Sequence, residues 1–379
     1  MLTLSQFEII RPTYESSQEE TLNWLIQAHT QSEAYTQGKQ AEQIQPFTLN
    51  LKQKLDHVAC KPNRISKRGH VLSDFLHTEW EKMKVYRLEE SSFGVDLTTR
   101  SKIFSDQVEA AFEQFYPESA TSPDHLIHVT CTGYVSPSGG QKMVSQRGWG
   151  EKTVVSHVYH MGCSASIPAL RLAQGSLQAE DCIDIVHTEI CSLHTNPSLH
   201  ELNQLVSQSL FADGFIKYRA QSSCSSEHFQ LYILHEELVS NSFNAMHWKM
   251  ENWGFALSLS QEIPALIAQS IYPYLVRMSQ KSGFTIEYIL QNALFAIHPG
   301  GPKIVQSIQA VLGLSFAQVA HSKFILQQFG NMSSATLPHV WKEILEDSKV
   351  VSGSLIVSLA FGPGLTICGS IMEKRLPCG

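Results

Sequence analysis

Apolar and polar residues alternate along this chain with two periods, one typical of helices and one typical of strands. Helical spacing of the apolar positions occupies residues 18–58, 103–116 and 263–280. Ser17 stands before the first of these helices, at the position of a capping residue. Runs rich in β-branched residues begin near residues 125, 182 and 228 and predict strands there. Strands that alternate with helices are typical of a layered α/β fold, which is the fold class that we predict.

Several predicted strands lead through a short turn directly into a helix. Such units occupy residues 152–178, 293–313 and 324–345. Residues 354–372 predict two closing strands joined at a Gly-Pro-Gly turn. Because both parts of the chain bring a polar residue to the start of a helix, we predict two similar halves.

The boundary between these halves is placed after residue 225. Residues 1–225 then carry a candidate nucleophilic cysteine, and residues 226–379 carry a candidate histidine and asparagine. A chain of 379 residues is long enough for two such halves.

Composition and charge exclude several classes of function. Hydrophobic residues make up 43% and charged residues 17% of the chain, and the formal net charge is −7. Nucleic acid is therefore not an expected partner. No apolar run approaches the roughly 20 residues of a membrane span, and no signal peptide is evident.

The cysteines and histidines predict neither a disulfide framework nor a metal site. Eight cysteines are scattered without a C-x-x-C pair, which fits a reduced cytoplasmic location. His157 and His160 lie three residues apart on a predicted strand, so their side chains face opposite sides of it. We expect no metal ion.

Cys163 is the first candidate for chemistry. It lies in "YHMGCSASIPALRLAQG", where a strand meets a helix that is expected to begin near Ser164. The free N–H groups and positive end of a helix lower the pKa of a thiol and favour the nucleophilic thiolate. The alternative interpretation is a buried structural cysteine.

His298 and Asn331 lie at two further joints. His298 follows an apolar strand in "FAIHPGGP", and Asn331 follows an expected strand in "FGNMSSA". Ser333 and Ser334 can cap the next helix. A thiolate, an imidazole and an amide together suit acyl transfer through a thioester.

The segments that carry these residues match a known family. The segments "GCSASIPALRLAQG", "HPGGPKIVQSIQAVLG", "GNMSSATLPHVWKEIL" and "FGPGLT" resemble the chalcone synthase-like, or type III, polyketide synthases. The order and spacing agree, with 135 residues from Cys163 to His298 and 33 from there to Asn331. The resemblance covers nearly the whole chain and is strongest after residue 125.

The resemblance implies a fold, an assembly and a reaction. It implies a thiolase-like fold, with two βαβαβαββ halves in five αβαβα layers, and a homodimer. Cys163 would take an acyl starter from a thioester, and His298 would pair with the thiolate as an imidazolium. His298 and Asn331 would hold the thioester oxygen of a malonyl-type extender during decarboxylation and Claisen condensation. The donors would be acyl-CoA and malonyl-CoA or an acyl carrier protein, and no cofactor is implied.

The resemblance also assigns residues around the reacting groups. Phe211 matches an aromatic gate to the substrate tunnel, and Ser333 matches a position that helps cyclisation. Lys54, His57 and Lys61 lie where plant enzymes carry a basic trio that binds the CoA phosphates.

Other pocket positions depart from the plant pattern. The departures are His194 beside Cys191, Trp248, Leu257, Ser136 at a position that reaches across the dimer, and Ala360 in the Gly-Pro-Gly loop. They predict a rebuilt cavity of microbial type that takes an aliphatic acyl or β-ketoacyl starter. The resemblance to the family implies cyclisation to a pyrone or phenolic product.

Two related reactions stay open at this point. One is a ketosynthase that performs a single condensation between two carrier-bound acyl chains and forms a pyrone. The other is an initiating ketoacyl-ACP synthase, although the "GNMSSA" and "FGPG" segments favour the polyketide synthases. A papain-like protease also orders its residues Cys, His, Asn, but "GCSASIPA" lacks the aromatic residue expected after the nucleophile.

Overall fold

A nine-stranded sheet forms the centre of the computed structural model, which describes residues 1–177 and 182–376. One part of the sheet has the spatial order β5 (Val154–Tyr159), β4 (His125–Thr130), β6 (Cys182–Glu189), β7 (Gly214–Gln221) and β1 (Thr3–Ile10). The other part continues with β8 (His228–Leu238), β13 (Thr366–Arg375), β12 (Leu355–Gly362) and β11 (Leu294–Ile297). Short pairing between β1 and β8 joins the two parts.

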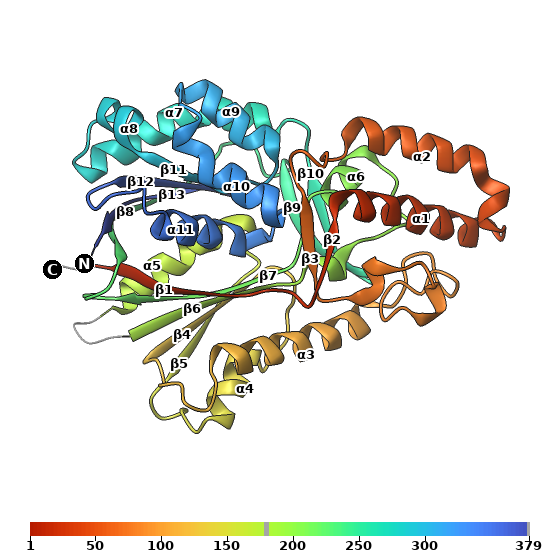
Figure 1. Cartoon of the computed structure of the whole chain (residues 1–379), viewed down its shortest axis with the longest axis horizontal. Coiled ribbons are helices and arrows are strands. Elements are labelled where there is room, and N and C mark those ends of the chain that lie inside the picture. The colour runs from red at the N-terminus through yellow and green to blue at the C-terminus, as the bar shows by residue number, and fades with distance from the viewer. Residues whose placement is uncertain (178–181, 377–379) are drawn as a thin grey trace.

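Helices cover both parts of the sheet and also fill the space between them (Figure 1). Helices α5 (Ser166–Ser176) and α11 (Thr336–Glu346) form the middle layer, and each contacts strands from both parts. Helices α3 (Leu97–Phe115) and α4 (Gly139–Gln146) form one outer layer. Helices α7 (Ile263–Ser282), α8 (Ile286–Asn292) and α9 (Pro302–Leu312) lie on the other side, and α10 (Ala320–Phe329) packs against α11 and contacts β11. The α/β class and the five-layer thiolase-like arrangement are confirmed.

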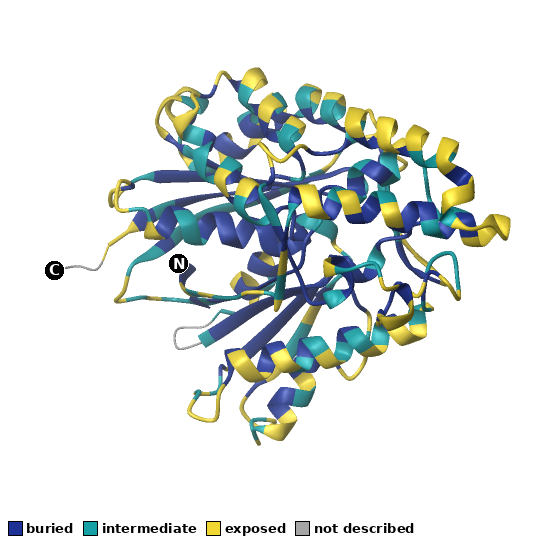
Figure 2. Cartoon of the chain, turned by 45° about the vertical axis from the view of Figure 1, so that its right-hand side comes forward, coloured by how far each residue is buried: buried dark blue, intermediate teal, exposed yellow. Residues whose placement is uncertain are grey.

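Burial distinguishes the middle layer from the outer layers (Figure 2). All residues of α11 from Thr336 to Trp341 are buried, because sheets cover the helix on two sides. Trp341 still satisfies its indole N–H, which donates to Ser358 Oγ at 2.9 Å. The outer helix α9 buries only Val305, Ile308 and Leu312, the single apolar face that its sequence spacing predicts.

The first half follows the order βαβαβαββ, and the second half departs from it at one point. Residues 324–329, predicted as a strand before Asn331, belong instead to helix α10. A short apolar run fits either element, and here Ile325 and Leu326 face the core from a helix. The place of the missing strand is taken by a single bridge between Asn331 and Phe211. The boundary after residue 225 stays a prediction.

A helical extension stands beside the layers. It contains α1 (Gln18–Gln37), α2 (Gln45–Val58), α6 (Leu202–Gln208), the hairpin of β9 (Met246–Glu251) with β10 (Gly254–Leu259), and the pair of β2 (Tyr14–Ser17) with β3 (Lys67–His70). The predicted cap of α1 is confirmed, since Ser17 Oγ accepts from the Glu20 N–H at 3.2 Å. Within the described residues, no helix is long and apolar enough to cross a membrane.

Candidate active site

Cys163 lies in a tight turn between β5 and α5. The turn is a 3₁₀ segment, Gly162–Ser164, and α5 begins at Ser166, slightly later than the sequence predicted. Gly162 has φ +66°, and a Cβ at this position would lie 2.4 Å from Pro363 Cδ. The loop between β12 and β13 therefore packs against the turn and holds Cys163 in position.

His298 and Asn331 come from two neighbouring loops of the second half. His298 follows β11 and is 2% exposed, and its N–H donates to Leu359 O at 2.7 Å. Asn331 is 1% exposed, and its backbone exchanges hydrogen bonds with Leu210 and Ala212 at 2.9 Å each. Asn331 Nδ2 also donates to Gly300 O at 3.2 Å, which connects the asparagine to the loop after His298.

One cavity of about 800 Å³ is lined by Cys163, His298 and Asn331 together. Its wall is mainly apolar and includes Phe211, Leu257, Met246, Ile263, Ile267 and Phe361. Both ring nitrogens of His298 lack a hydrogen-bond partner among the described residues. One N–H of the Asn331 amide also stays available after the bond to Gly300, because an amide carries two. The site can therefore donate two hydrogen bonds to an oxygen placed beside the sulfur.

Burial determines the protonation states of the Cys163 thiol and the His298 imidazole. It raises the pKa of the Cys163 thiol to about 12 and lowers the pKa of the His298 imidazole to about 3. The expected low thiol pKa is therefore wrong for this structure, because burial outweighs the positive end of a helix that begins beyond the cysteine. Both groups are neutral here, and His298 is able to accept a proton.

Ser333 and Ser334 do not cap the helix that follows them, which corrects the prediction. Helix α11 has no side-chain cap. The Ser333 hydroxyl lies 3.9 Å from Cys163 Sγ, and Ser334 Oγ donates to the Glu189 carboxylate.

Glu189 is a buried group that the sequence analysis missed. It ends β6 and accepts from the Cys131 N–H at 3.0 Å and from Thr132 Oγ1 at 2.9 Å. Burial raises the pKa of its carboxyl group. These bonds hold the loop after β4 against the loop that carries Ser333 and Ser334. An acidic residue at the end of a predicted strand, in "DIVHTEIC", was the available signal.

The structure separates the predicted pocket residues into two groups. Phe211 and Leu257 line the cavity, whereas Cys191, His194, Trp248 and Ser136 are absent from its described lining.

His194 and Trp248 bond to the loop after β4 instead. His194 Nε2 donates to Thr132 O at 2.7 Å, and its ring stacks on Phe255 with centroids 4.6 Å apart. Trp248 Nε1 donates to Cys131 O at 2.6 Å. Cys191 is buried in a neighbouring turn, and Ser136 is exposed in the loop before α4.

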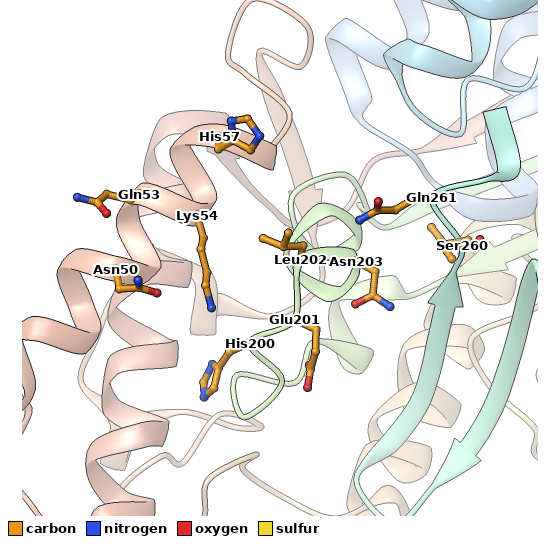
Figure 3. A pocket seen from close by; sticks show the side chains of 11 residues that line it. Asn50, Gln53, Lys54, His57, His200, Glu201, Leu202, Asn203, Ser260 and Gln261 are labelled. Carbon is orange, nitrogen blue, oxygen red and sulfur yellow. The ribbon is translucent and has the colours of Figure 1, made fainter. Parts of the chain in front are cut away.

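The predicted basic trio is also divided. Lys61 lines the first cavity, Lys54 lines a second, adjoining cavity of about 840 Å³, and His57 lines both (Figure 3). Two cations that the sequence analysis missed, Arg64 and Lys303, line the mouth of the first cavity. Nothing in a single exposed lysine or arginine marks it as part of a site.

Known families and proteins match most of the chain. Residues 21–217 match the N-terminal domain of chalcone and stilbene synthases, and residues 230–375 match the C-terminal domain. "Probable polyketide synthase 1" of Dictyostelium discoideum is 30% identical over 66% of this chain and 8% of its own length. "Alpha-pyrone synthesis polyketide synthase-like Pks18" of Mycobacterium tuberculosis is 29% identical over 68% of this chain and 66% of its own length.

Solved structures share the fold over nearly the full length. PKS-I from the brown alga Ectocarpus siliculosus has a TM-score of 0.83 at 18% identity, with 98% of each chain covered. The 1,3,6,8-tetrahydroxynaphthalene synthase of Streptomyces coelicolor A3(2) has a TM-score of 0.79 at 20% identity, covering 98% of this chain and 99% of that one. At this level of identity the likeness concerns the fold.

Proposed function

The chain belongs to the chalcone and stilbene synthase family, and we propose that it is a type III polyketide synthase that extends acyl chains on Cys163. The observation that carries the proposal is the common cavity of Cys163, His298 and Asn331, with both imidazole nitrogens unpaired among the described residues. Relatives whose names specify polyketide and pyrone synthesis support it.

Loading of the starter is the first step. The sulfur of Cys163 attacks the thioester carbonyl of the acyl donor, and neutral His298 takes the thiol proton. The bond between the carbonyl carbon and the donor sulfur breaks, and the proton passes to the departing thiolate. The products are an acyl-cysteine and the free donor thiol.

Decarboxylation of the extender follows in the same cavity. The carbon–carbon bond to the malonyl carboxylate breaks, carbon dioxide leaves, and the electron pair moves to the thioester oxygen as an enolate. An N–H of His298 and the free N–H of Asn331 hold this oxygen. Each preorganised donor can contribute about 3–4 kcal/mol to such a step.

Condensation then transfers the chain. The enolate carbon attacks the carbonyl of the acyl-cysteine, a carbon–carbon bond forms, and the carbon–sulfur bond to Cys163 breaks. Repetition followed by ring closure gives a pyrone or a phenolic product. The substrates are CoA or phosphopantetheine thioesters, and the scheme uses no further cofactor.

The apolar wall favours an aliphatic starter. Leu257, Met246, Ile263 and Ile267 line the same cavity as Cys163, and burial of a methylene group against such a wall contributes about 0.8 kcal/mol. Phe211 is proposed as the gate and His57 with Lys61 as part of the mouth.

We also propose a cytoplasmic homodimer. Strand β5 is an unpaired edge of the described sheet, and Val154 on it and Tyr134 beside its end are exposed by 63% and 65%. A second copy would cover these apolar groups. The cysteines of the described residues are free thiols, which fits a reducing compartment.

The test is a product assay with purified protein. Acyl-CoA starters of increasing length and malonyl-CoA are supplied together, in parallel with the same acyl groups on a carrier protein, and products are identified by mass spectrometry. Iterative extension that is lost in Cys163→Ala and kept in the control Cys224→Ala is the expected result. A single condensation that requires two carrier-bound chains would favour the ketosynthase instead.

A further inference from the structure

Arg68 of β3 is a buried cation that contacts the segment of the proposed gate but is absent from the described lining of the reaction cavity. Its side chain is only 2% exposed, and Nη1 donates to Gln208 O and to Phe211 O at 2.8 Å each. Burial lowers its pKa to about 10, so the guanidinium stays charged at neutral pH. Burial of a charge is costly unless hydrogen bonds compensate for it, and here these bonds go to the residue of the gate itself.

Residues 208–213, called the gate segment below, are held by β3 at a second place. The Asp213 N–H donates to Gly69 O at 3.0 Å. The Val71 N–H, directly after β3, donates to the Asp213 carboxylate at 2.7 Å. Arg68 and its neighbours therefore hold both ends of the gate segment.

The opposite edge of the gate segment holds Asn331. The Asn331 N–H donates to Leu210 O, and the Ala212 N–H donates to Asn331 O, at 2.9 Å each. Successive peptide groups of an extended chain point to opposite sides. The carbonyl of Phe211, which lies between these two bonds, therefore points away from Asn331 and accepts from Arg68. Arg68 and Asn331 thus bond to the same short stretch of backbone from its two sides.

Arg68 also packs against the residue that precedes Asn331. A Cβ at Gly330 would lie 3.1 Å from Arg68 Cγ and 3.1 Å from Leu210 O. The aliphatic part of Arg68 therefore contacts the turn of Asn331, while its charged end contacts the gate segment. A change of this side chain acts on Asn331 along both routes.

We propose that Arg68 is a positioning residue, which fixes the Asn331 amide where it meets the enolate oxygen and the Phe211 ring at the gate. This inference rests on the proposed function, because it takes the donor role of Asn331 from there. A guanidinium has planar, fixed donors, whereas a lysine keeps the charge without this geometry. Loss of Arg68 shifts Asn331 but leaves Cys163 and His298, which lie on other loops, in place.

Two partial reactions separate these groups. In the proposed scheme, loading uses Cys163 and His298, whereas decarboxylation of the extender also uses Asn331. Loading is measured as the acyl mass gained by the protein without extender. Decarboxylation is measured as the acetyl thioester formed from the malonyl thioester without starter, which gives kcat and KM. Each thioester is supplied on CoA and on a carrier protein, and Arg68→Met and Arg68→Lys are compared with the wild type.

Arg100 offers a matched control for the loss of a buried guanidinium. It is fully buried, and it donates to backbone carbonyls that include Val95 O at 3.0 Å and Thr195 O at 3.3 Å. Its described hydrogen bonds go to residues outside the gate segment and outside residues 330–331. Arg100→Met and Arg100→Lys therefore remove a similar group without a contact to Asn331.

The expected result is a selective loss of decarboxylation. Arg68→Met lowers its kcat about 100-fold, the effect of a displacement of about 1 Å, while its KM and the loading rate change by less than about threefold. Arg68→Lys restores part of the lost rate. The Arg100 variants change loading and decarboxylation by the same factor, that of the folded fraction.

Hydrogen exchange gives a readout that needs no turnover. The amides of Ala212 and Asn331 are followed by mass spectrometry of the peptides that contain them. They should exchange at least about tenfold faster in Arg68→Met and at the wild-type rate in Arg100→Met, since local opening follows the loss of local bonds.

Three outcomes would overturn the inference: equal losses of loading and decarboxylation in the Arg68 variants, unchanged decarboxylation, or unchanged exchange of these two amides. If the methionine variants do not fold, the lysine variants decide by the same criteria. If the wild type performs neither partial reaction, the proposed function fails, and the exchange of Ala212 and Asn331 alone decides whether Arg68 positions them.

Discussion

Substitution of Gly162 by alanine should displace the nucleophile by a predictable amount. The new Cβ would lie 2.4 Å from Pro363 Cδ, more than 1 Å inside an ordinary contact, and Pro363 is held in the loop between β12 and β13. The left-handed backbone at Gly162 costs alanine about 1–2 kcal/mol, and the overpacking adds about 1–3 kcal/mol. Displacement of a reacting atom by about 1 Å can reduce the rate roughly 100-fold.

Substitution of Gly313 by alanine is a matched control, because it measures only the free-energy cost of the left-handed backbone. Its φ is +65°, against +66° at Gly162, but a Cβ there meets no atom within 4 Å. Urea denaturation should therefore show a loss of about 1–2 kcal/mol in Gly313→Ala with normal acyl loading. Gly162→Ala should lose a further 1–3 kcal/mol, roughly, and load Cys163 about 100-fold more slowly. Equal stability and equal loading rates in the two variants would refute the role of the Pro363 contact.

Three further predictions concern two thiols, the cavity wall and Asp213, a buried carboxyl group in the segment just before β7. Because burial raises the pKa of Cys163 to about 12, its alkylation by iodoacetamide should rise about tenfold per unit between pH 6 and 9, and a fast plateau near pH 6 would indicate an ion pair with His298 instead. Cys224 should label faster, since hydrogen bonds with Ser226 lower its pKa despite partial burial; peptide mapping distinguishes the two. Burial raises the pKa of Asp213 to about 6, although Ser192 and Val71 donate hydrogen bonds to it. The ionised carboxylate therefore destabilises the folded state above pH 6, and its protonation removes this destabilisation as the pH falls toward 4. The wild type should therefore gain about 2 kcal/mol relative to Asp213→Asn between pH 7 and 4.5 in urea titrations, and a constant difference would contradict this shift. Leu257→Trp should shift starter preference toward short acyl chains several-fold in a competition assay read by mass spectrometry, whereas unchanged preference would place the starter elsewhere.

The positions of the reacting residues were predictable because glycine and proline mark the turns that carry them. Gly162 before Cys163 and the Pro-Gly-Gly after His298 interrupt apolar runs, and the structure has a strand end before each turn. The closing strands β12 and β13 were equally predictable from the sequence. Most of their residues are apolar on both faces of the strand, and both faces are buried in the structure.

The environment of these residues was not predictable from local pattern. The segment before Asn331 is too short and apolar for its period to distinguish a strand from helix α10. The high pKa of Cys163 arises from burial by segments distant in the sequence, which no local motif specifies. His194 and Trp248 were assigned to the pocket by position, yet their polar atoms bond to the backbone of the loop after β4. Lys54 and Lys61 lie seven residues apart, but Lys54 lies on α2 and lines the second cavity, whereas Lys61 follows the helix and lines the first.

Mass mapping of the acylated protein shows directly whether Cys163 carries the acyl chain. Purified protein is incubated with an acyl-CoA in the absence of extender, digested at mildly acidic pH, and its thiol-bearing peptides are weighed. We expect one added acyl mass on the peptide that contains Cys163, with none in Cys163→Ala and slower acquisition in His298→Gln. An acyl group found on another cysteine, or loading that persists without the Cys163 sulfur, would contradict it.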